Sequence, residues 1–336
     1  MILSKNDRQL WGIPYQGSKT KLVEKIARFF PNADHFYDLF GGGFSVSHYM
    51  IKMRSKSYKT FHYNELRPGL CELIKDAIDG KYNYDVFKPE WITRERFMAE
   101  KETNPYIKII WSFGNNGTTY LFGKDIEQQK RSMHQAVIFD EFDSNMRDLF
   151  GLVKWPNKLT IEGKRLYLRR VINNRKGELQ QLEQLEQLEQ LEQLQQLERL
   201  EQLERLEQPQ QLERLQQLER LQQLERLNLT NLSYEQVEIK ENSVIYCDIP
   251  YKGTADYGNS FNHHKFFDWA NEQTNPVFIS EYNVSDSRFT MLKEFRHRTT
   301  FSNGKNEPVT ERLYGNKKAA EIINSAINNK QNNVVS

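Results

Sequence analysis

The spacing of apolar residues predicts alternating strands and helices in the first part of the chain. Apolar residues recur at helical intervals over 22–30, which predicts a helix. The apolar run 35–40 predicts a strand that leads into the glycines 41–43. A helix over 45–54 and a strand over 59–63 are expected next. Strand, glycine loop, helix and strand in this order predict a βαβ unit with a parallel sheet.

The second half of the chain predicts further strands of the same sheet. Apolar runs at 243–247 and 277–279 are typical of buried strands, and the first ends at Asp248. Helical spacing over 289–295 predicts a helix, and the polar tail 330–336 is expected to be flexible. These elements predict an α/β fold with a doubly wound sheet, which places its ligand at the carboxyl ends of the strands.

The region between these parts has a different pattern. Aromatic residues alternate with polar residues and glycines around Gly114-Asn115-Asn116-Gly117, which predicts a β-hairpin over 112–122. The stretch 125–149 is helical in composition and contains several Lys and Arg residues. We therefore assign 81–177 to a separate, smaller module.

A leucine repeat follows the middle region. Leucine recurs at every third position ten times from Leu179 to Leu206 and six times from Leu212 to Leu227, and Pro209 interrupts the series. The residues between are Glu, Gln and Arg, which favour an α-helix. However, three residues turn an α-helix by about 300°, so the leucines drift around the helix and make no heptad seam.

This pattern leaves three interpretations of the repeat at 178–227 open. It is a surface insertion that grew by duplication, an arm for self-association, or a tract without helical structure. The first two predict helix, and the second predicts that the chain associates with itself through 178–227.

Charge and cysteine content narrow the class of protein. The repeat carries 12 Glu and 5 Arg, a charge of −7, which leaves +9 for the rest of a chain whose total is +2. A basic body of this kind is a candidate for binding nucleic acid. Cys71 and Cys247 are isolated thiols, so we expect a reducing compartment and no metal site. No segment has the ~20 apolar residues of a membrane span, so we expect no membrane partner.

The strongest chemical motif is Asp248-Ile249-Pro250-Tyr251, directly after a predicted strand. A carboxylate and a backbone carbonyl that both accept hydrogens from an amino group hold its nitrogen toward tetrahedral geometry. The proline fixes the loop so that a neighbouring carbonyl faces the base. The aromatic ring of Tyr251 provides a surface on which a flipped-out base stacks.

Three upstream features fit a nucleotide-like cofactor. The segment 38–45, Asp-Leu-Phe-Gly-Gly-Gly-Phe-Ser, places glycines after a strand and before a helix, where a ligand approaches the backbone closely. Glu65 follows the next strand and is placed to accept hydrogen bonds from a ribose. Lys19, in the segment 14–19 before the first helix, is unfavourable to the helix dipole and suggests an anionic partner.

The motif order Pro-Tyr-x-Gly-Ser-Lys, Asp-Leu-Phe-Gly-Gly-Gly-Phe-Ser, a basic and aromatic segment, then Asp-Ile-Pro-Tyr resembles the Dam-type (D12 class) DNA adenine-N6 methyltransferases. The resemblance covers most of the chain except the leucine repeat. It implies a Rossmann-like fold, S-adenosylmethionine as methyl donor, double-stranded DNA as partner and a cytoplasmic protein of bacterial or bacteriophage origin. It also implies a catalytic domain formed by 1–80 and 228–329, with target recognition in 81–177.

The resemblance assigns roles to residues that match its motifs. Asp248 and the Pro250 region hold the adenine amino group, and Tyr251 stacks on the ring. The residues expected to bind the cofactor are Tyr15, Lys19, Asp38, Phe40, Gly41, Gly42, Gly43, Glu65 and Asp248. The residues expected to contact DNA are Asn115, Asn116, Thr118, Lys124 and Arg131.

Two departures and two alternatives accompany this interpretation. The family usually has proline where Ile249 stands, and the leucine repeat is not part of its shared core. Cytosine-N4 methylation uses the same tetrapeptide, so the local residues leave it open. A protein of a different class, which binds DNA or assembles through the repeat without catalysis, is the other alternative.

Overall fold

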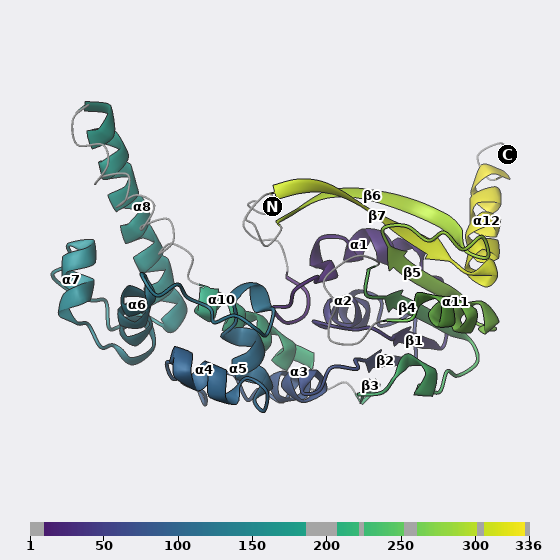
Figure 1. The fold of residues 1–336 in the computed structure, drawn as a ribbon, viewed down its shortest axis with the longest axis horizontal. Coiled ribbons are helices and arrows are strands. Elements are labelled where there is room, and N and C mark those ends of the chain that lie inside the picture. The colour runs from purple at the N-terminus through teal and green to yellow at the C-terminus, as the bar shows by residue number, and fades with distance from the viewer. Residues whose placement is uncertain (1–9, 186–206, 222–224, 252–260, 301–305, 333–336) are drawn as a thin grey trace. The chain divides into compact units, whose positions relative to one another are not determined.

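The computed structural model describes residues 10–185, 207–221, 225–251, 261–300 and 306–332. The chain divides into two compact units (Figure 1). The sheet unit consists of Met1–Ile78 and Arg220–Ser336, and the helical unit is Asp79–Glu219. The boundary at 219/220 lies inside the predicted insertion 178–227, while the functional roles expected for each domain remain predictions.

A seven-stranded sheet forms the centre of the sheet unit, in the order β3-β2-β1-β4-β5-β7-β6. Strands β1 to β5 run parallel to one another, whereas β7 is antiparallel to both β5 and β6. The strands are β1 His35–Asp38, β2 Thr60–Asn64, β3 Leu227–Thr230, β4 Ser243–Asp248, β5 Val277–Glu281, β6 Thr290–Thr300 and β7 Asn306–Gly315. This mixed sheet with its flanking helices confirms the predicted Rossmann-like α/β fold (Figure 1).

The strand order reverses between β1 and β4, which are adjacent in the sheet although about 200 residues separate them in the sequence. At such a reversal, the connections that follow the two adjacent strands run to opposite faces of the sheet. They leave a crevice at the carboxyl ends of the strands. Asp38 ends β1 and Asp248 ends β4. The topology therefore brings the ends of two predicted motifs to one place.

The predicted central strands form because they are buried on both faces. All five residues of β5 are buried, as are the first five of β4. Such strands read as continuous apolar runs, which is why their sequences were recognisable. Tyr37, Ile245, Cys247 and Ile279 pack in one core cluster with Phe266.

The sheet unit contains predicted helices and others that were not predicted from the sequence, at Leu70–Ile78, His263–Glu272 and Lys317–Asn332. The helix expected over 22–30 is divided into short segments, and α2 occupies the predicted place. Residues 330–332, expected to be flexible, continue the last helix, and 333–336 lie outside the described residues. The helices are η1 Lys19–Lys21, α1 Val23–Ile26, η2 Ala27–Phe29, α2 Ser45–Met53, α3 Leu70–Ile78, η5 Tyr234–Gln236, α11 His263–Glu272 and α12 Lys317–Asn332.

The helix predicted over 289–295 was wrong, because this segment lies in strand β6. Pairing with β7 supplies its backbone partners from Thr290 onward. A register shift between Met291 and Lys293 interrupts the pairing. Such an irregularity breaks the two-residue alternation by which a strand is recognised in sequence.

The helical unit contains a core of its own. Met133 and Val137 pack with Met146, Leu168 and Ile172 in one buried cluster. The helical stretch predicted over 125–149 is two helices, because Asp140 ends the first in a left-handed conformation. The helices are α4 Arg94–Glu100, α5 Pro105–Ile110, η3 Phe113–Asn115, α6 Glu127–Phe139, α7 Ser144–Phe150, α8 Ile161–Leu185, α10 Glu207–Gln216 and η4 Gln217–Leu221, which ends in the sheet unit.

The described part of the leucine repeat is helical up to Leu221, and its segment 212–221 is packed in the protein rather than lying on the surface. Leu212, Leu215 and Leu218 are fully buried and Leu221 is 6% exposed. Helix α10 becomes a 3-10 helix after Gln216. A 3-10 helix has three residues per turn, so leucines three apart stay on one face and the expected drift stops. Residues 186–206 and 222–224 lie outside the described residues, so self-association remains a prediction.

None of the helices in the described parts of the chain is long and apolar enough to cross a membrane.

We predict that Leu215→Ala destabilises the protein by about 2–5 kcal/mol, because it removes a fully buried side chain and leaves a cavity. Denaturant unfolding measures the change. Leu166→Ala on α8, where the side chain is 48% exposed, is the control and should change stability by about 0.5 kcal/mol. Equal stability of Leu215→Ala and wild type would show that the repeat is peripheral.

Candidate active site

A buried ion pair joins the N-terminal segment to the end of β4. Lys19 Nζ lies 2.7 Å from Asp248 Oδ1, and the two side chains are 8% and 19% exposed. Lys19 reaches this place because η1 begins beside the glycine loop, where its backbone N–H donates to Ser45 Oγ. The predicted anionic partner of Lys19 is thus a protein carboxylate.

Strand β7 contributes a second carboxylate to the same lysine. Glu311 Oε1 lies 3.5 Å from Lys19 Nζ, and its side chain is 5% exposed. Burial acts to lower the pKa of Lys19, but the charges of Asp248 and Glu311 outweigh it and the pKa is raised. Lys19 is therefore a permanent cation between two carboxylates.

The two strand-end carboxyl groups have raised pKa values. Burial raises the pKa of Asp248 to about 6, with Glu311 adding to the shift and Lys19 opposing it. Burial likewise raises the pKa of Asp38 to about 7, against hydrogen bonds from Ser47 and with a contribution from the charge of Asp248. Perturbed carboxyl groups that cluster in this way are typical of functional sites.

Tyr251 lies against the ion pair. Its hydroxyl donates to Asp248 Oδ1 at 3.3 Å, and Lys19 Nζ lies 4.9 Å from the centre of its ring. The ring of Tyr282, which follows β5, packs edge-on at 4.4 Å between centroids. The residue that follows β5 therefore contacts the tetrapeptide.

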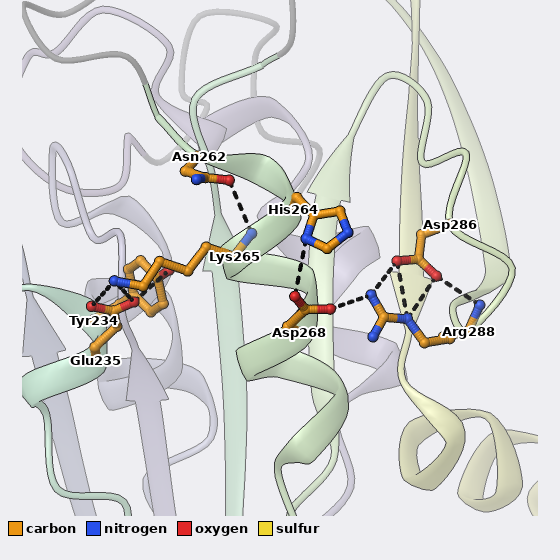
Figure 2. A network of polar contacts seen from close by, with 8 residues as sticks. All are labelled: Tyr234, Glu235, Asn262, His264, Lys265, Asp268, Asp286 and Arg288. Atoms are coloured by element: carbon orange, nitrogen blue, oxygen red, sulfur yellow. Dashed lines mark hydrogen bonds and ion pairs between the residues drawn. The ribbon is translucent and has the colours of Figure 1, made fainter.

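Helix α11 fixes the backbone of the tetrapeptide from the other side. His263 Nε2 donates to the carbonyl oxygen of Pro250 at 2.9 Å. Residues 252–260 between them lie outside the described residues. Figure 2 shows the ion pairs Lys265–Glu235 and Arg288–Asp268, which join α11 to other segments. Asp286 also pairs with Arg288, and His264 lies 3.0 Å from Asp268 within the helix.

The glycine loop is held by side chains that require glycine. A Cβ on Gly41 would lie 2.1 Å from the ring of Tyr63, whose hydroxyl donates to the carbonyl of Gly42 at 2.7 Å. Gly42 has a φ of +47°, and its N–H donates to Glu65 Oε2 at 2.9 Å. Glu65, expected to bind a ribose, thus also shapes the loop.

One carboxylate oxygen of Asp38 has no hydrogen-bond donor among the described residues. Its Oδ2 accepts hydrogen bonds from the backbone N–H and the hydroxyl of Ser47, at 3.1 and 2.8 Å. Its Oδ1 is buried and has no hydrogen-bond partner among the residues that the structure describes. Buried acceptors are nearly always satisfied, so this oxygen fits a donor from a ligand.

The remaining predicted cofactor residues have mixed surroundings. Tyr15 lies beside the loop, where its hydroxyl accepts a hydrogen bond from Arg67, and a Cβ on Gly43 would lie 2.4 Å from the Tyr15 Cβ. Phe40 instead packs in an aromatic cluster with Tyr234 and Phe266.

Within the described residues, no group of three or more His, Cys, Asp or Glu side chains is arranged to hold a metal ion.

Residues 15–154 match the family model of the D12 class N6 adenine-specific DNA methyltransferases. This match supports adenine-N6 methylation of DNA as the function of the protein. The match covers less than half of the chain and includes the glycine loop and Glu65 but not Asp248. It does not favour cytosine-N4 methylation or a non-catalytic protein. A search of curated proteins finds no match.

The methyltransferase does not have the hairpin that we predicted over 112–122. One antiparallel bridge, between Ser112 and Tyr120, closes a loop that contains the short helix η3. The Asn115 side chain donates to the carbonyl of Ile109 at 2.9 Å, and Asn116 Oδ1 accepts the N–H of Thr118 at 2.8 Å. These bonds account for both asparagines as residues that shape the loop.

The other predicted DNA contacts lie on the surface of the helical unit. Thr118 is exposed in the loop, Lys124 is exposed after it, and Arg131 is exposed on α6. They are accessible to a ligand, and their contact with DNA remains a prediction.

Sequence reasoning missed several residues of the site. Glu311, Ser47, Tyr63 and His263 all contact the predicted motifs but belong to no motif themselves. Ser47 had a detectable signal, since it stands at the start of the helix that follows the glycine loop. Glu311 had no detectable signal in the sequence, because its position depends on the antiparallel placement of β7.

We predict that Gly41→Ala destabilises the methyltransferase by about 1–3 kcal/mol and weakens cofactor binding, because the new methyl group displaces the Tyr63 ring. Thermal unfolding and calorimetric titration measure the two effects. Gly123→Ala is the control, because its Cβ would meet the side chain of Asp125, with Oδ1 at 2.6 Å; the exposed Asp125 can move aside. Equal behaviour of the two variants would contradict the role of the loop.

Proposed function

We propose that the site at the carboxyl ends of β1 and β4 transfers the methyl group of S-adenosylmethionine to N6 of an adenine that is flipped out of duplex DNA. The observation that carries this proposal is the orientation of Asp248. Lys19 and the Tyr251 hydroxyl both contact its Oδ1. The other oxygen, Oδ2, is then the one that accepts a hydrogen from an incoming amino group.

A second acceptor comes from the backbone of the tetrapeptide. The carbonyl of Pro250 accepts from His263, so the preceding carbonyl, that of Ile249, is the acceptor for the second amino hydrogen. Two acceptors on one amino group draw its lone pair out of conjugation with the ring. The base stacks on Tyr251, whose ring Lys19 and Tyr282 hold in place.

The residues around Asp38 fit the cofactor. When bound, S-adenosylmethionine supplies an electrophilic methyl group next to the acceptor nitrogen. The buried Oδ1 of Asp38 fits the ammonium group of the cofactor, since it is an acceptor without a donor among the described residues. Glu65 accepts the N–H groups of Gly42 and Arg67, one on each oxygen. Each oxygen retains acceptor capacity for a ribose hydroxyl.

Asp248 also accepts the proton that the amino group loses on methylation. The amino nitrogen gains a bond to carbon and must lose one hydrogen, and Asp248 Oδ2 already accepts that hydrogen. A carboxyl group with a pKa of about 6 accepts a proton more readily than an ordinary aspartate and releases it again near neutral pH. Lys19 keeps its charge throughout because its own pKa is raised.

For duplex DNA, we propose that the loop at 112–122 and α6 face the target. Thr118, Lys124 and Arg131 are the exposed candidates. Lysine and arginine supply phosphate contacts, whereas threonine also reads base edges. Asn115 and Asn116 hold the loop in shape.

We predict that Asp248→Asn lowers methyl transfer roughly 10²–10³-fold, because the amide cannot replace the negative acceptor in the transition state. Incorporation of labelled methyl groups into DNA measures the rate, and modified-base sequencing identifies the product. Asp34→Asn is the control, because Asp34 lies at the opposite end of β1 and pairs with Lys59. Equal incorporation by wild type and Asp248→Asn would overturn the assignment of the site.

The pH profile provides an independent prediction. Because the carboxylate form of Asp248 is the active one and its pKa is about 6, kcat/KM for DNA should fall tenfold per unit as the pH drops below 6. Saturating cofactor keeps Asp38 ionised during the measurement. An acid limb near pH 4, the ordinary range of aspartate, would contradict the raised pKa.

A further inference from the structure

Glu311 is a buried carboxylate of the site that the reaction proposed above does not use. It lies on β7, next to β5 in the sheet, and its exposed fraction is 4%. Its Oε1 approaches Lys19 Nζ to 3.5 Å, while Asp248 Oδ1 lies closer, at 2.7 Å. Lys19 is thus shared, with Asp248 as the nearer partner.

The negative charge of Glu311 extends beyond Lys19. It contributes to raising the pKa of Asp248, and it contributes in the same direction at Tyr251, Tyr282 and Tyr246. All of these groups face the ends of β4 and β5. The charge of Lys19 opposes this effect at Asp248 and Tyr282, so it offsets part of the negative charge of Glu311 there.

Burying a second carboxylate is costly, although hydrogen bonds with Lys19 and Tyr251 offset part of that cost for Glu311. Lys19 already has a buried partner in Asp248. An additional buried charge costs several kcal/mol of desolvation unless another charge offsets it. A ligand that brings positive charge to this place would offset part of that cost.

The proposed methyl donor has such a charge. Its sulfonium and ammonium groups are positive and its carboxylate is negative, so it carries a net charge of +1 near neutral pH. Its product, S-adenosylhomocysteine, has lost the sulfonium charge and is neutral overall. A negative field in the pocket therefore acts on the donor more strongly than on the product.

We propose that Glu311 is a positioning residue that holds Lys19 at Asp248 and favours the positively charged methyl donor over its neutral product. This inference rests on the function proposed above, because it takes S-adenosylmethionine as the ligand. It assigns to Glu311 a role in exchanging spent cofactor for fresh cofactor. Glu311 acts on the ligand through the electrostatic field of its negative charge, and on Asp248 through the position of Lys19.

The test compares two ligands on the same protein. The affinities of S-adenosylmethionine and S-adenosylhomocysteine are measured by calorimetry on the full chain, as wild type and as Glu311→Gln. Glutamine keeps the shape of the side chain and removes its charge. We therefore expect the affinity for S-adenosylmethionine, relative to the affinity for S-adenosylhomocysteine, to fall on the order of tenfold. The affinity for the product should change little, and this also shows that the variant is folded.

Two further variants separate charge from structure. Glu294→Gln, on the neighbouring strand β6, removes a carboxylate that pairs with Arg312 and Arg296 and should leave the ratio unchanged. Glu311→Asp keeps the charge and should retain most of the wild-type ratio. An aspartate variant that is folded but has the ratio of Glu311→Gln overturns the proposal.

The outcomes distinguish this inference from the proposed function. If the wild-type protein binds neither ligand, the proposed function itself is wrong. If it binds both, and Glu311→Gln changes both affinities equally, the function stands and the role of Glu311 is refuted. If the glutamine variant does not fold, Glu311 has a structural role and the proposal is refuted.

Discussion

The pairing of Lys19 with Asp248 is the constraint from which the rest of the site follows. A buried charge must be paired, so the segment before α1 must reach the end of β4. It does so by crossing the glycine loop, where the N–H of Ile13 donates to the carbonyl of Gly43 at 2.8 Å. A Cβ on Gly12 would lie 2.1 Å from that same carbonyl oxygen. Close approach of two backbones thus links the N-terminal motif, the glycine loop and the tetrapeptide.

Much of this site could be predicted because its residues follow strands. A residue at the end of a buried parallel strand lies at the ligand-binding edge whatever the rest of the fold does, and this placed Asp38, Glu65 and Asp248. Glu311 could not be found in this way, since β7 is antiparallel and the segment paired with it was expected to be a helix. Its position depends on a tertiary pairing that no local pattern records.

The leucine repeat and the loop at 112–122 show a different limit of sequence reasoning. A three-residue period is incompatible with one face of an α-helix but fits the 3-10 turn at Gln217–Leu221, a conformation rare enough to be a poor first guess. In the loop, asparagine and glycine indicated a turn correctly. The side chains of Asn115 and Asn116 also complete hydrogen bonds of the loop itself, which asparagine often does, and their contact with DNA remains a prediction.

The division of the sheet between two distant stretches of sequence affects how the protein folds during synthesis. Strand β1 pairs with β4, which leaves the ribosome about 200 residues later, or about 10–40 s at ordinary rates of translation. During that interval β1 and β2 have an unpaired edge, while the helical unit, whose residues are contiguous in sequence, can already fold. The nascent chain therefore exposes the half-built ligand pocket, and a chaperone that covers this edge would protect it until β4 arrives.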